Sequence, residues 1–193
     1  KTLKRALLAT VLASAACAEP RAPELLAVLP DFTMSVVGAK GEAPFGLKDM
    51  LGRVWVADFI FTRCGGPCPL LSTRLSELSR VLAPEVGLLS VTVDPEGDTP
   101  ARLRAYARSY GADPSRWVFL RGSIADTYRI LYAGFRQPLS VNPQSPAESR
   151  VTHSTRFVLV DKQGGIRGFY DALSDEDNAA LARDAHRLLE AGS

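Results

Sequence analysis

The sequence predicts a single α/β domain in which helices flank a central sheet. The first observation is a set of nearly unbroken apolar runs, such as 54–61 and 86–93, which are typical of buried strands. The second is that leucines recur at helical spacing between these runs. With 193 residues, 46% hydrophobic and 23% charged, the chain fits one domain better than two. A domain of this length buries roughly 70% of its unfolded surface, so it can fold without a structural metal or disulfide.

The first eighteen residues are typical of an export signal. Three cations, the last of them Arg5, precede an apolar run from Ala6 to Ala16 that contains no acidic residue. The run is too short for an ordinary transmembrane helix. Without residues 1–18 the formal net charge falls from +2 to about −1, which argues against a nucleic-acid partner. We therefore expect a domain exported to an oxidising compartment such as the periplasm.

Cys17 lies at the end of this signal and has two alternative fates. The segment Ala16-Cys17-Ala18 matches a cleavage site between small residues, and cleavage there would remove the cysteine. Alternatively, Cys17 is the acylated residue of a lipoprotein, although Ser14 stands where such sites usually carry leucine. Acylation would associate the protein with a membrane through its N-terminus.

The chain after the signal begins with a predicted extension of the sheet. Residues 19–30 hold three prolines and no periodic pattern, so we expect a linker there and a folded domain over 31–193. Alternation over 31–37, followed by two glycines, predicts a β-hairpin whose second arm ends near Leu47. A short helix is expected at 47–51. The central strand 54–61 follows.

The remaining chain alternates between predicted helices and strands. Leucine spacing marks the first helix, and Ser or Thr residues at N-cap positions mark the later ones. The segment 134–150 holds three prolines and few large apolar groups, and is expected to be a functional or disordered loop. The expected elements are helices at 69–83, 100–110, 123–132 and 174–190, and strands at 86–93, 117–120, 151–161 and 166–170.

Two cysteines lie where the central strand meets the next helix, in the stretch Phe59-Ile-Phe-Thr-Arg-Cys-Gly-Gly-Pro-Cys-Pro69. Positions i and i+4 share a helix face, so Cys64 and Cys68 can form a disulfide or bind one soft metal ion. A helix N-terminus and the neighbouring Arg63 favour the thiolate form. A cysteine pair at this junction, within this order of elements, is the arrangement of a thioredoxin-like fold. We thus expect a central mixed sheet flanked by helices, with an N-terminal β-hairpin extension.

Three separated segments resemble the Sco/SenC family of thioredoxin-like copper-binding proteins. The cysteine stretch resembles the family pattern T-x-C-P-x-x-C-P. The segment Val93-Asp-Pro-Glu-Gly-Asp-Thr-Pro100 is similar to D-P-x-x-D-T-P, and Val151-Thr-His-Ser154 is similar to a D-H-S segment ahead of a strand. The resemblance spans about residues 31–190.

This resemblance implies that Cys64, Cys68 and His153 bind one copper ion, as Cu(I) or Cu(II). It also implies a metallochaperone that helps to assemble the dinuclear copper (CuA) site of cytochrome c oxidase. The implied partners are the copper-site subunit of the oxidase or another copper chaperone. Two thiolates and one imidazole are too few ligands for structural zinc or an iron–sulfur cluster, which favours copper. A three-ligand zinc site with a bound water is the alternative.

Two residues depart from the family pattern. Gly65 stands where the family usually has proline, which is expected to loosen the loop and to change its redox potential or metal affinity. Thr152 stands where the family usually has aspartate, and so removes a carboxylate that could orient the imidazole. Asp94 and Asp98 are candidates for supporting groups around the site, although their turn and cap roles explain them.

The same cysteine pair supports an alternative function. An extracytoplasmic thiol–disulfide reductase would use Cys64 as its attacking thiol on oxidase-subunit cysteines, with Cys64 and Cys68 as its catalytic pair. A weaker alternative is a redox or copper sensor that signals through the segment 134–150. We expect His186 on a solvated helix face. The two methionines and two tryptophans are expected to pack in the core.

Overall fold

The computed structural model of the protein describes residues 21–38, 41–142, 144–149 and 151–191. The predicted signal segment and Cys17 lie outside the described residues. The centre is an eight-stranded mixed sheet in the order β1-β10-β9-β4-β5-β6-β2-β3, and β7 and β8 form a separate two-stranded sheet. The strands are β1 Ala27–Val28, β2 Thr33–Gly38, β3 Gly41–Gly46, β4 Trp55–Ile60, β5 Gly87–Thr92, β6 Trp117–Arg121, β7 Leu139–Val141, β8 Val151–His153, β9 Arg156–Val160 and β10 Gly165–Asp171.

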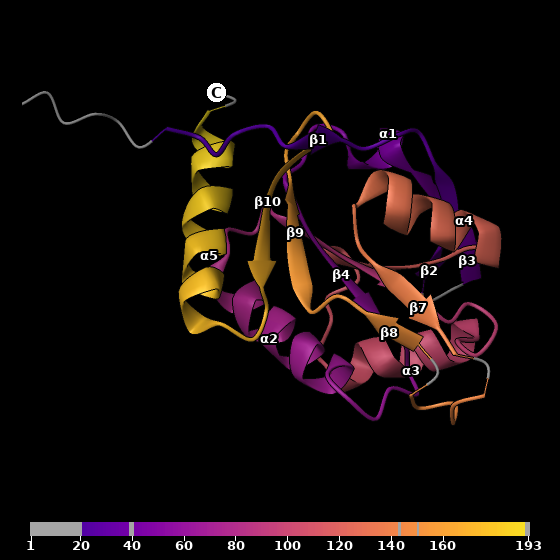
Figure 1. The fold of residues 1–193 in the computed structure, drawn as a ribbon. Coiled ribbons are helices and arrows are strands. Elements are labelled where there is room, and N and C mark those ends of the chain that lie inside the picture. The colour runs from indigo at the N-terminus through magenta and orange to yellow at the C-terminus, as the bar shows by residue number, and fades with distance from the viewer. Residues whose placement is uncertain (1–20, 39–40, 143, 150, 192–193) are drawn as a thin grey trace, which may run out of the picture.

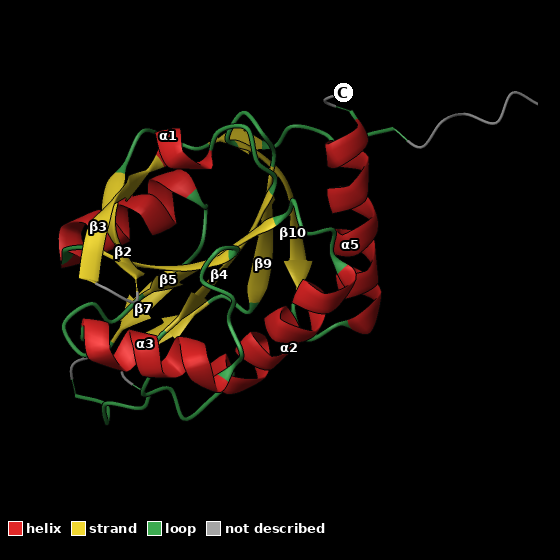
Figure 2. Cartoon of the chain, turned by 180° about the vertical axis from the view of Figure 1, so that it is seen from behind, coloured by secondary structure: helices red, strands yellow, loops and turns green. Residues whose placement is uncertain are grey.

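Helices cover both faces of the large sheet, as expected for an α/β domain (Figures 1 and 2). On one face α2, α3 and α5 pack through leucines such as Leu75, Leu103 and Leu181. On the other face α1 and the helices after β6 pack through Met50 and Ile130. The helices are α1 Leu47–Met50, α2 Cys68–Val81, α3 Pro100–Ser109, α4 Ile124–Arg129, the π-helical η1 Ile130–Gly134 and α5 Asp175–Glu190.

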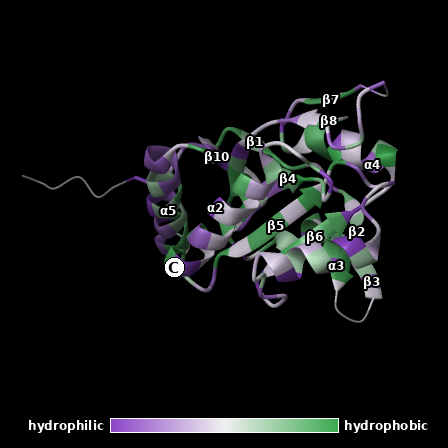
Figure 3. Cartoon of the chain, turned by 90° about the horizontal axis from the view of Figure 1, so that it is seen from below, coloured by the Kyte–Doolittle hydropathy of each residue, from purple (hydrophilic) through white to green (hydrophobic). Residues whose placement is uncertain are grey.

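The strands β4, β5 and β6 run parallel to one another at the middle of the sheet. All residues of β4 and β5 are buried, because helices cover both of their faces. Figure 3 shows the apolar colouring along β5 at the centre of the molecule. Strand β9 extends the sheet antiparallel to β4 on one side, and the predicted N-terminal hairpin, β2 and β3, extends it beyond β6 on the other. The thioredoxin-like fold class is thus confirmed.

The predicted helix starts are confirmed by capping geometry. The side chain of Thr99 accepts the N–H of Arg102 at the start of α3, where Pro100 occupies the first turn. Ser123 and Ser174 accept backbone N–H groups in the same way at the starts of α4 and α5. Each cap satisfies a donor that the first helical turn leaves free, so these boundaries follow from local sequence.

Two segments differ from expectation. Ala27–Val28, within the expected linker, pairs with β10 as β1, and Leu29 is buried beside it. The expected loop 134–150 contains β7, which pairs with β8. The predicted strand 151–161 is two strands in the structure, β8 and β9, which are separated by two residues. A strand of two or three residues is too short to show an alternation of apolar and polar residues in the sequence. Such strands are defined only by the strands with which they pair.

Candidate metal centre

The segment 61–67, here called the cysteine loop, connects β4 to α2. Cys68 is the first residue of α2 and is fully buried, whereas Cys64 is half-buried. Both cysteines are free thiols in this structure. Because α2 begins at Cys68, that thiol lies at the helix N-terminus and Cys64 lies in the loop that precedes it. The sequence prediction of a cysteine pair at a strand-to-helix junction is confirmed.

His153, the last residue of β8, brings an imidazole to this pair. Its Nε2 lies 3.1 Å from Sγ of Cys68. Its Nδ1 lies 2.9 Å from the carbonyl oxygen of Ser154, which can only accept, so Nδ1 carries the proton. Nε2 consequently carries a lone pair and no proton, which is the tautomer that a metal ligand requires. The ring of Phe61 packs edge-on against the imidazole and supports this orientation.

The two thiols are electrostatically unequal. The pKa of Cys64 is lowered to about 4, chiefly because the Cys68 thiol donates a hydrogen bond to it. His153 and the backbone N–H groups of Cys68 and Gly66 also lower it, against the opposing effect of burial. The same hydrogen bond, together with burial, raises the pKa of Cys68. The pair is thus a thiolate at Cys64 beside a thiol at Cys68.

The charge of Arg63 is paired with Asp94 and not with the Cys64 thiolate. Its guanidinium donates to Asp94 at 2.6 Å, and Asp94 also accepts the N–H of Gly97. The sequence argument assigned the thiolate form partly to Arg63, but Arg63 is not among the causes that lower the pKa of Cys64, of which the hydrogen bond from Cys68 is the largest.

Asp98 anchors the start of the cysteine loop through hydrogen bonds. Its side chain is 0% exposed and accepts both the N–H of Thr62, at 3.0 Å, and the Thr62 hydroxyl, at 2.6 Å. It also accepts the hydroxyl of Thr92. Burial, the largest effect, raises the pKa of Asp98, and these hydrogen bonds oppose it. Asp94 and Asp98 therefore tie Arg63 and Thr62, the two residues before Cys64, to the turn that follows β5.

Cys64 and His153 line a hollow of about 340 Å³ that opens beside the cysteine loop. Residues from the segment before β8, including Glu148, form its other wall. Among the described residues, no three His, Cys, Asp or Glu side chains stand in the arrangement of a formed metal site. The fold thus brings Cys64, Cys68 and His153 next to one another, with Cys68 and His153 in hydrogen-bond contact rather than spread around a central ion.

The backbone of Gly65 is hydrogen-bonded to the opposite wall of the hollow. The sequence did not predict this contact. The N–H of Gly65 donates to the carbonyl oxygen of Glu148 at 3.2 Å. A proline at this position would lack that donor. The glycine was expected to loosen the loop, but its N–H ties the loop to residues 144–149. The sequence carries no signal for Glu148. Thr152 is exposed, and the Ser154 carbonyl orients the imidazole instead.

The Gly65 contact predicts that Gly65→Pro frees the segment 144–149. Loss of one backbone hydrogen bond, worth about 1 kcal/mol, should speed amide hydrogen exchange in that segment about fivefold. Gly65→Ala is the matched control, because it keeps the N–H and places its Cβ 3.4 Å from Cβ of Glu148. Equal exchange rates in the proline and alanine variants would show that this hydrogen bond does not hold the segment.

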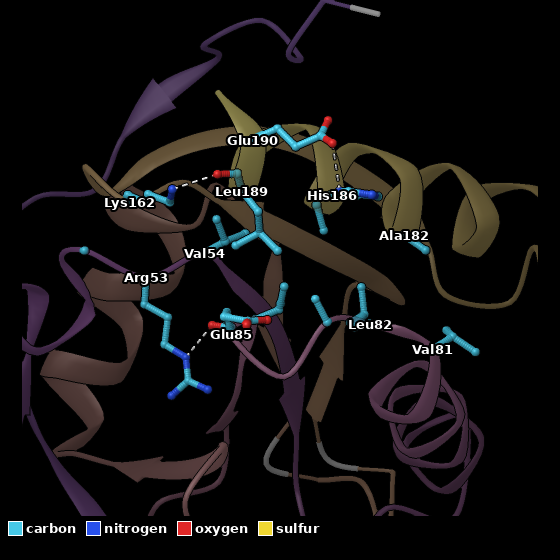
Figure 4. Close-up of a pocket in the computed structure, with 14 residues that line it drawn as sticks. Arg53, Val54, Val81, Leu82, Glu85, Lys162, Ala182, His186, Leu189 and Glu190 are labelled. Atoms are coloured by element: carbon cyan, nitrogen blue, oxygen red, sulfur yellow. Dashed lines mark hydrogen bonds and ion pairs between the residues drawn. The ribbon is translucent and has the colours of Figure 1, made fainter. Parts of the chain in front are cut away.

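His186, the second histidine, lies far from this centre in the chain and in the fold. It lines a hollow of about 680 Å³ where the ends of α2 and α5 meet (Figure 4). Its side chain is 72% exposed, and its Nδ1 lies 3.8 Å from Oε1 of Glu190. Neither cysteine lines this hollow. The prediction of a solvated face residue is confirmed, and so is the burial of the remaining candidates, Met34, Met50, Trp55 and Trp117.

Within the described ranges, no helix combines the length and apolar character that crossing a bilayer requires.

A family model and several known proteins resemble most of the described chain. The SCO1/SenC family model matches residues 27–190. The SCO1 protein homolog of Bacillus subtilis (strain 168) is 31% identical over 133 residues, which cover 67% of each chain. A putative copper-binding protein of Stutzerimonas stutzeri is 29% identical over 136 residues, which cover 67% of this chain and 63% of that one.

Solved structures agree with this assignment. A SCO1/SenC family lipoprotein from Bacillus anthracis str. Ames matches with a TM-score of 0.74 at 31% identity, covering 84% of this chain and 95% of that one. BsSco, a member of the Sco family of cytochrome c oxidase assembly proteins, matches with a TM-score of 0.71 at 26% identity, covering 88% and 99%. Since the family model spans the sheet, the cysteine loop and His153, the chain belongs to the SCO1/SenC family.

Proposed function

We propose that the protein is a copper metallochaperone that binds one copper ion through Cys64, Cys68 and His153. The observation that carries this proposal is the 3.1 Å contact between Sγ of Cys68 and Nε2 of His153, which joins residues 85 positions apart. The Stutzerimonas stutzeri relative is named as a copper-binding protein, and BsSco is described as a cytochrome c oxidase assembly protein. By this likeness, the acceptor of the copper is the CuA site of cytochrome c oxidase.

The donor set suits copper as cargo. Two sulfur ligands and one imidazole favour Cu(I), a soft ion that accepts low coordination numbers. The half-buried Cys64 and His153 line the hollow, whereas the buried Cys68 is not among its lining residues. An ion entering through the hollow therefore meets the Cys64 thiolate first, and the same opening admits a ligand from an acceptor protein. Binding requires both thiols to be reduced and Cys68 to lose its proton.

An anaerobic titration with Cu(I) against a chromophoric chelator tests this function. The wild-type chain should bind one tight equivalent, and Cys64→Ser and Cys68→Ser should each abolish tight binding, because an alcohol is a poor ligand for a soft ion. Preference for zinc over Cu(I), or undiminished binding by either serine variant, would contradict the proposal.

We further infer that the domain works outside the cytoplasm. Support comes from the apolar N-terminal segment and from the Bacillus anthracis relative, which is named as a lipoprotein. An oxidising compartment makes the redox state of Cys64 and Cys68 a condition for copper loading.

A thiol–disulfide reductase is the second candidate function. The thiolate at Cys64 beside a thiol at Cys68 is the charge distribution that an attacking cysteine and its resolving partner need. A rate on a protein disulfide substrate no better than that of a free dithiol would eliminate this candidate. The two functions are compatible, since reduction of the pair precedes copper loading.

A further inference from the structure

The strand that carries His153 belongs to a small sheet of its own. β7 and β8 pair with each other in a sheet that is separate from the eight-stranded one (Figure 1). A two-stranded sheet is only marginally stable in water by itself, so contacts outside the pair must hold it. In its register, Leu139 of β7 lies directly opposite His153 of β8. The position of β7 therefore affects where the imidazole lies.

Apolar packing alone does not fix the position of this small sheet. Leu139 and Val151 are 5% and 9% exposed and belong to the core cluster to which η1 also contributes. Such contacts favour burial but are non-directional, so they do not set the position of a strand along its own axis. The neighbouring Ser140 and Val141 are exposed. A directional contact is needed to hold β7.

The turn that leads into β7 is held by hydrogen bonds to the end of η1. The N–H of Gln137 donates to the carbonyl oxygen of Leu131, and its Nε2 donates to that of Phe135, both at 2.9 Å. The residue before it, Arg136, has a φ of 56°, a left-handed conformation that persists in a residue other than glycine only where surrounding contacts hold it. The turn is thus fixed, and one residue separates it from β7.

Tyr132 of η1 makes the directional contact with the strand itself. Its hydroxyl donates to the carbonyl oxygen of Leu139, the residue opposite His153. Its ring stacks on that of Tyr128, with centroids 6.1 Å apart, and this stacking supports the orientation of the hydroxyl. The side chain is 50% exposed, so it buries too little surface to act mainly as a core residue. Its hydrogen bond is therefore the feature to explain.

We propose that Tyr132 is a positioning residue of the copper site: its hydrogen bond to the Leu139 carbonyl holds β7 in place, and the pairing of β7 with β8 then holds His153 beside the cysteines. This inference rests on the proposed function and deepens it, because it concerns the histidine ligand. Tyr132 acts through His153 and does not bind the ion.

Other hydrogen bonds near His153 do not replace this anchor. The bond between its Nδ1 and the Ser154 carbonyl joins neighbours in the chain, so it moves with the strand. The bond from the Gly65 N–H to the Glu148 carbonyl holds the segment before β8 and does not reach β7. Without the Tyr132 hydroxyl, β7 and β8 should shift more freely, and the imidazole should spend less time beside the thiols.

The first test compares the Cu(I) affinity of the full wild-type chain with that of Tyr132→Phe, which keeps the ring and removes only the hydroxyl. Loss of a residue that orients a metal ligand costs about 10- to 100-fold in affinity. Tyr132 acts one strand away from the ligand, so affinity should fall about tenfold, at the lower end of that range. Anaerobic competition with a chromophoric chelator measures the change.

Tyr128→Phe is the matched control for this measurement. It removes a hydroxyl from the stacked ring and leaves the contact between Tyr132 and Leu139 in place. Its affinity for Cu(I) should stay within about twofold of the wild type. Wild-type affinity in Tyr132→Phe, or an equal loss in both tyrosine variants, would overturn the inference.

A double-mutant cycle separates positioning from a general loss of structure. If Tyr132 acts through the imidazole, Tyr132→Phe should lower affinity about tenfold in the wild-type background and should leave it unchanged in the His153→Ala background. The same loss in both backgrounds would contradict the positioning role, because a general structural defect does not depend on the presence of His153.

A measurement without metal keeps this inference separate from the copper assignment. In the reduced, metal-free chain, the nuclear Overhauser effect between the rings of Phe61 and His153, whose centroids lie 6.0 Å apart, reports the position of the imidazole. It should weaken in Tyr132→Phe and persist in Tyr128→Phe. An unchanged effect in Tyr132→Phe would contradict only the role of Tyr132. A wild-type chain that failed to bind copper would contradict the proposed function, and the weakened effect would still show that Tyr132 positions the imidazole.

Discussion

Replacing His153 by alanine is expected to lower the affinity for Cu(I) about hundredfold, or about 2.7 kcal/mol. The variant loses the imidazole whose Nε2 lies 3.1 Å from Sγ of Cys68 and retains both thiols. Removing a residue that only orients a metal ligand already costs about 10- to 100-fold, so loss of a ligand should reach at least the upper end of that range. Competition with a chromophoric chelator under anaerobic conditions measures the change.

The matched control is His186→Ala. This histidine is the other imidazole of the chain, but its exposed side chain on α5 contacts Glu190 rather than either cysteine. Its removal should leave copper affinity within about twofold of the wild type, as expected for a surface substitution. Wild-type affinity in His153→Ala would reduce the site to two cysteines and contradict the proposed ligand set.

Replacing Asp98 by alanine is expected to lower the free energy of unfolding by about 3 kcal/mol. The fully buried carboxyl accepts the N–H and hydroxyl of Thr62 and the hydroxyl of Thr92. Its removal leaves these donors without a partner in the interior, and each unsatisfied buried donor costs about 1–3 kcal/mol. Urea unfolding followed by circular dichroism measures the loss.

Asp94→Ala provides the comparison for this prediction, because it lies in the same turn and also holds the cysteine loop. Its ion pair with Arg63 is partly exposed, with side-chain exposures of 15% and 35%, and such pairs contribute about 1 kcal/mol or less. The free energies of unfolding of the two variants should therefore differ by about 2 kcal/mol. Equal losses would mean that burial of Asp98 adds nothing to the anchoring of the loop.

Local chemistry accounts for the parts of the fold that the sequence predicted well. Thr99, Ser123 and Ser174 cap the helices that their positions predicted, since capping depends only on neighbours within one turn. The long apolar strands β4 and β5 and the cysteine pair at the start of α2 were likewise visible, because each is a contiguous pattern. The likeness to the Sco/SenC family pointed to His153, which composition alone would not distinguish from His186.

Pairing between distant segments accounts for what the sequence missed. Strand β7 was hidden in a proline-rich segment, and its pairing with β8 places Leu139 opposite His153. The bond from Gly65 to Glu148 joins backbone groups 83 positions apart, and a backbone donor leaves no trace in residue type. Neither contact could be predicted from periodicity, because neither depends on a repeating pattern.

The sequence by itself determined the α/β class, the order of the elements and the position of a reactive cysteine pair, since these depend on residue type and short-range spacing. Only the tertiary structure decided which groups surround that pair: His153 through the β7–β8 sheet, and Asp98 through the turn after β5. Burial and proximity change the charge state of ionisable groups, and both arise only when distant parts of the chain pack together.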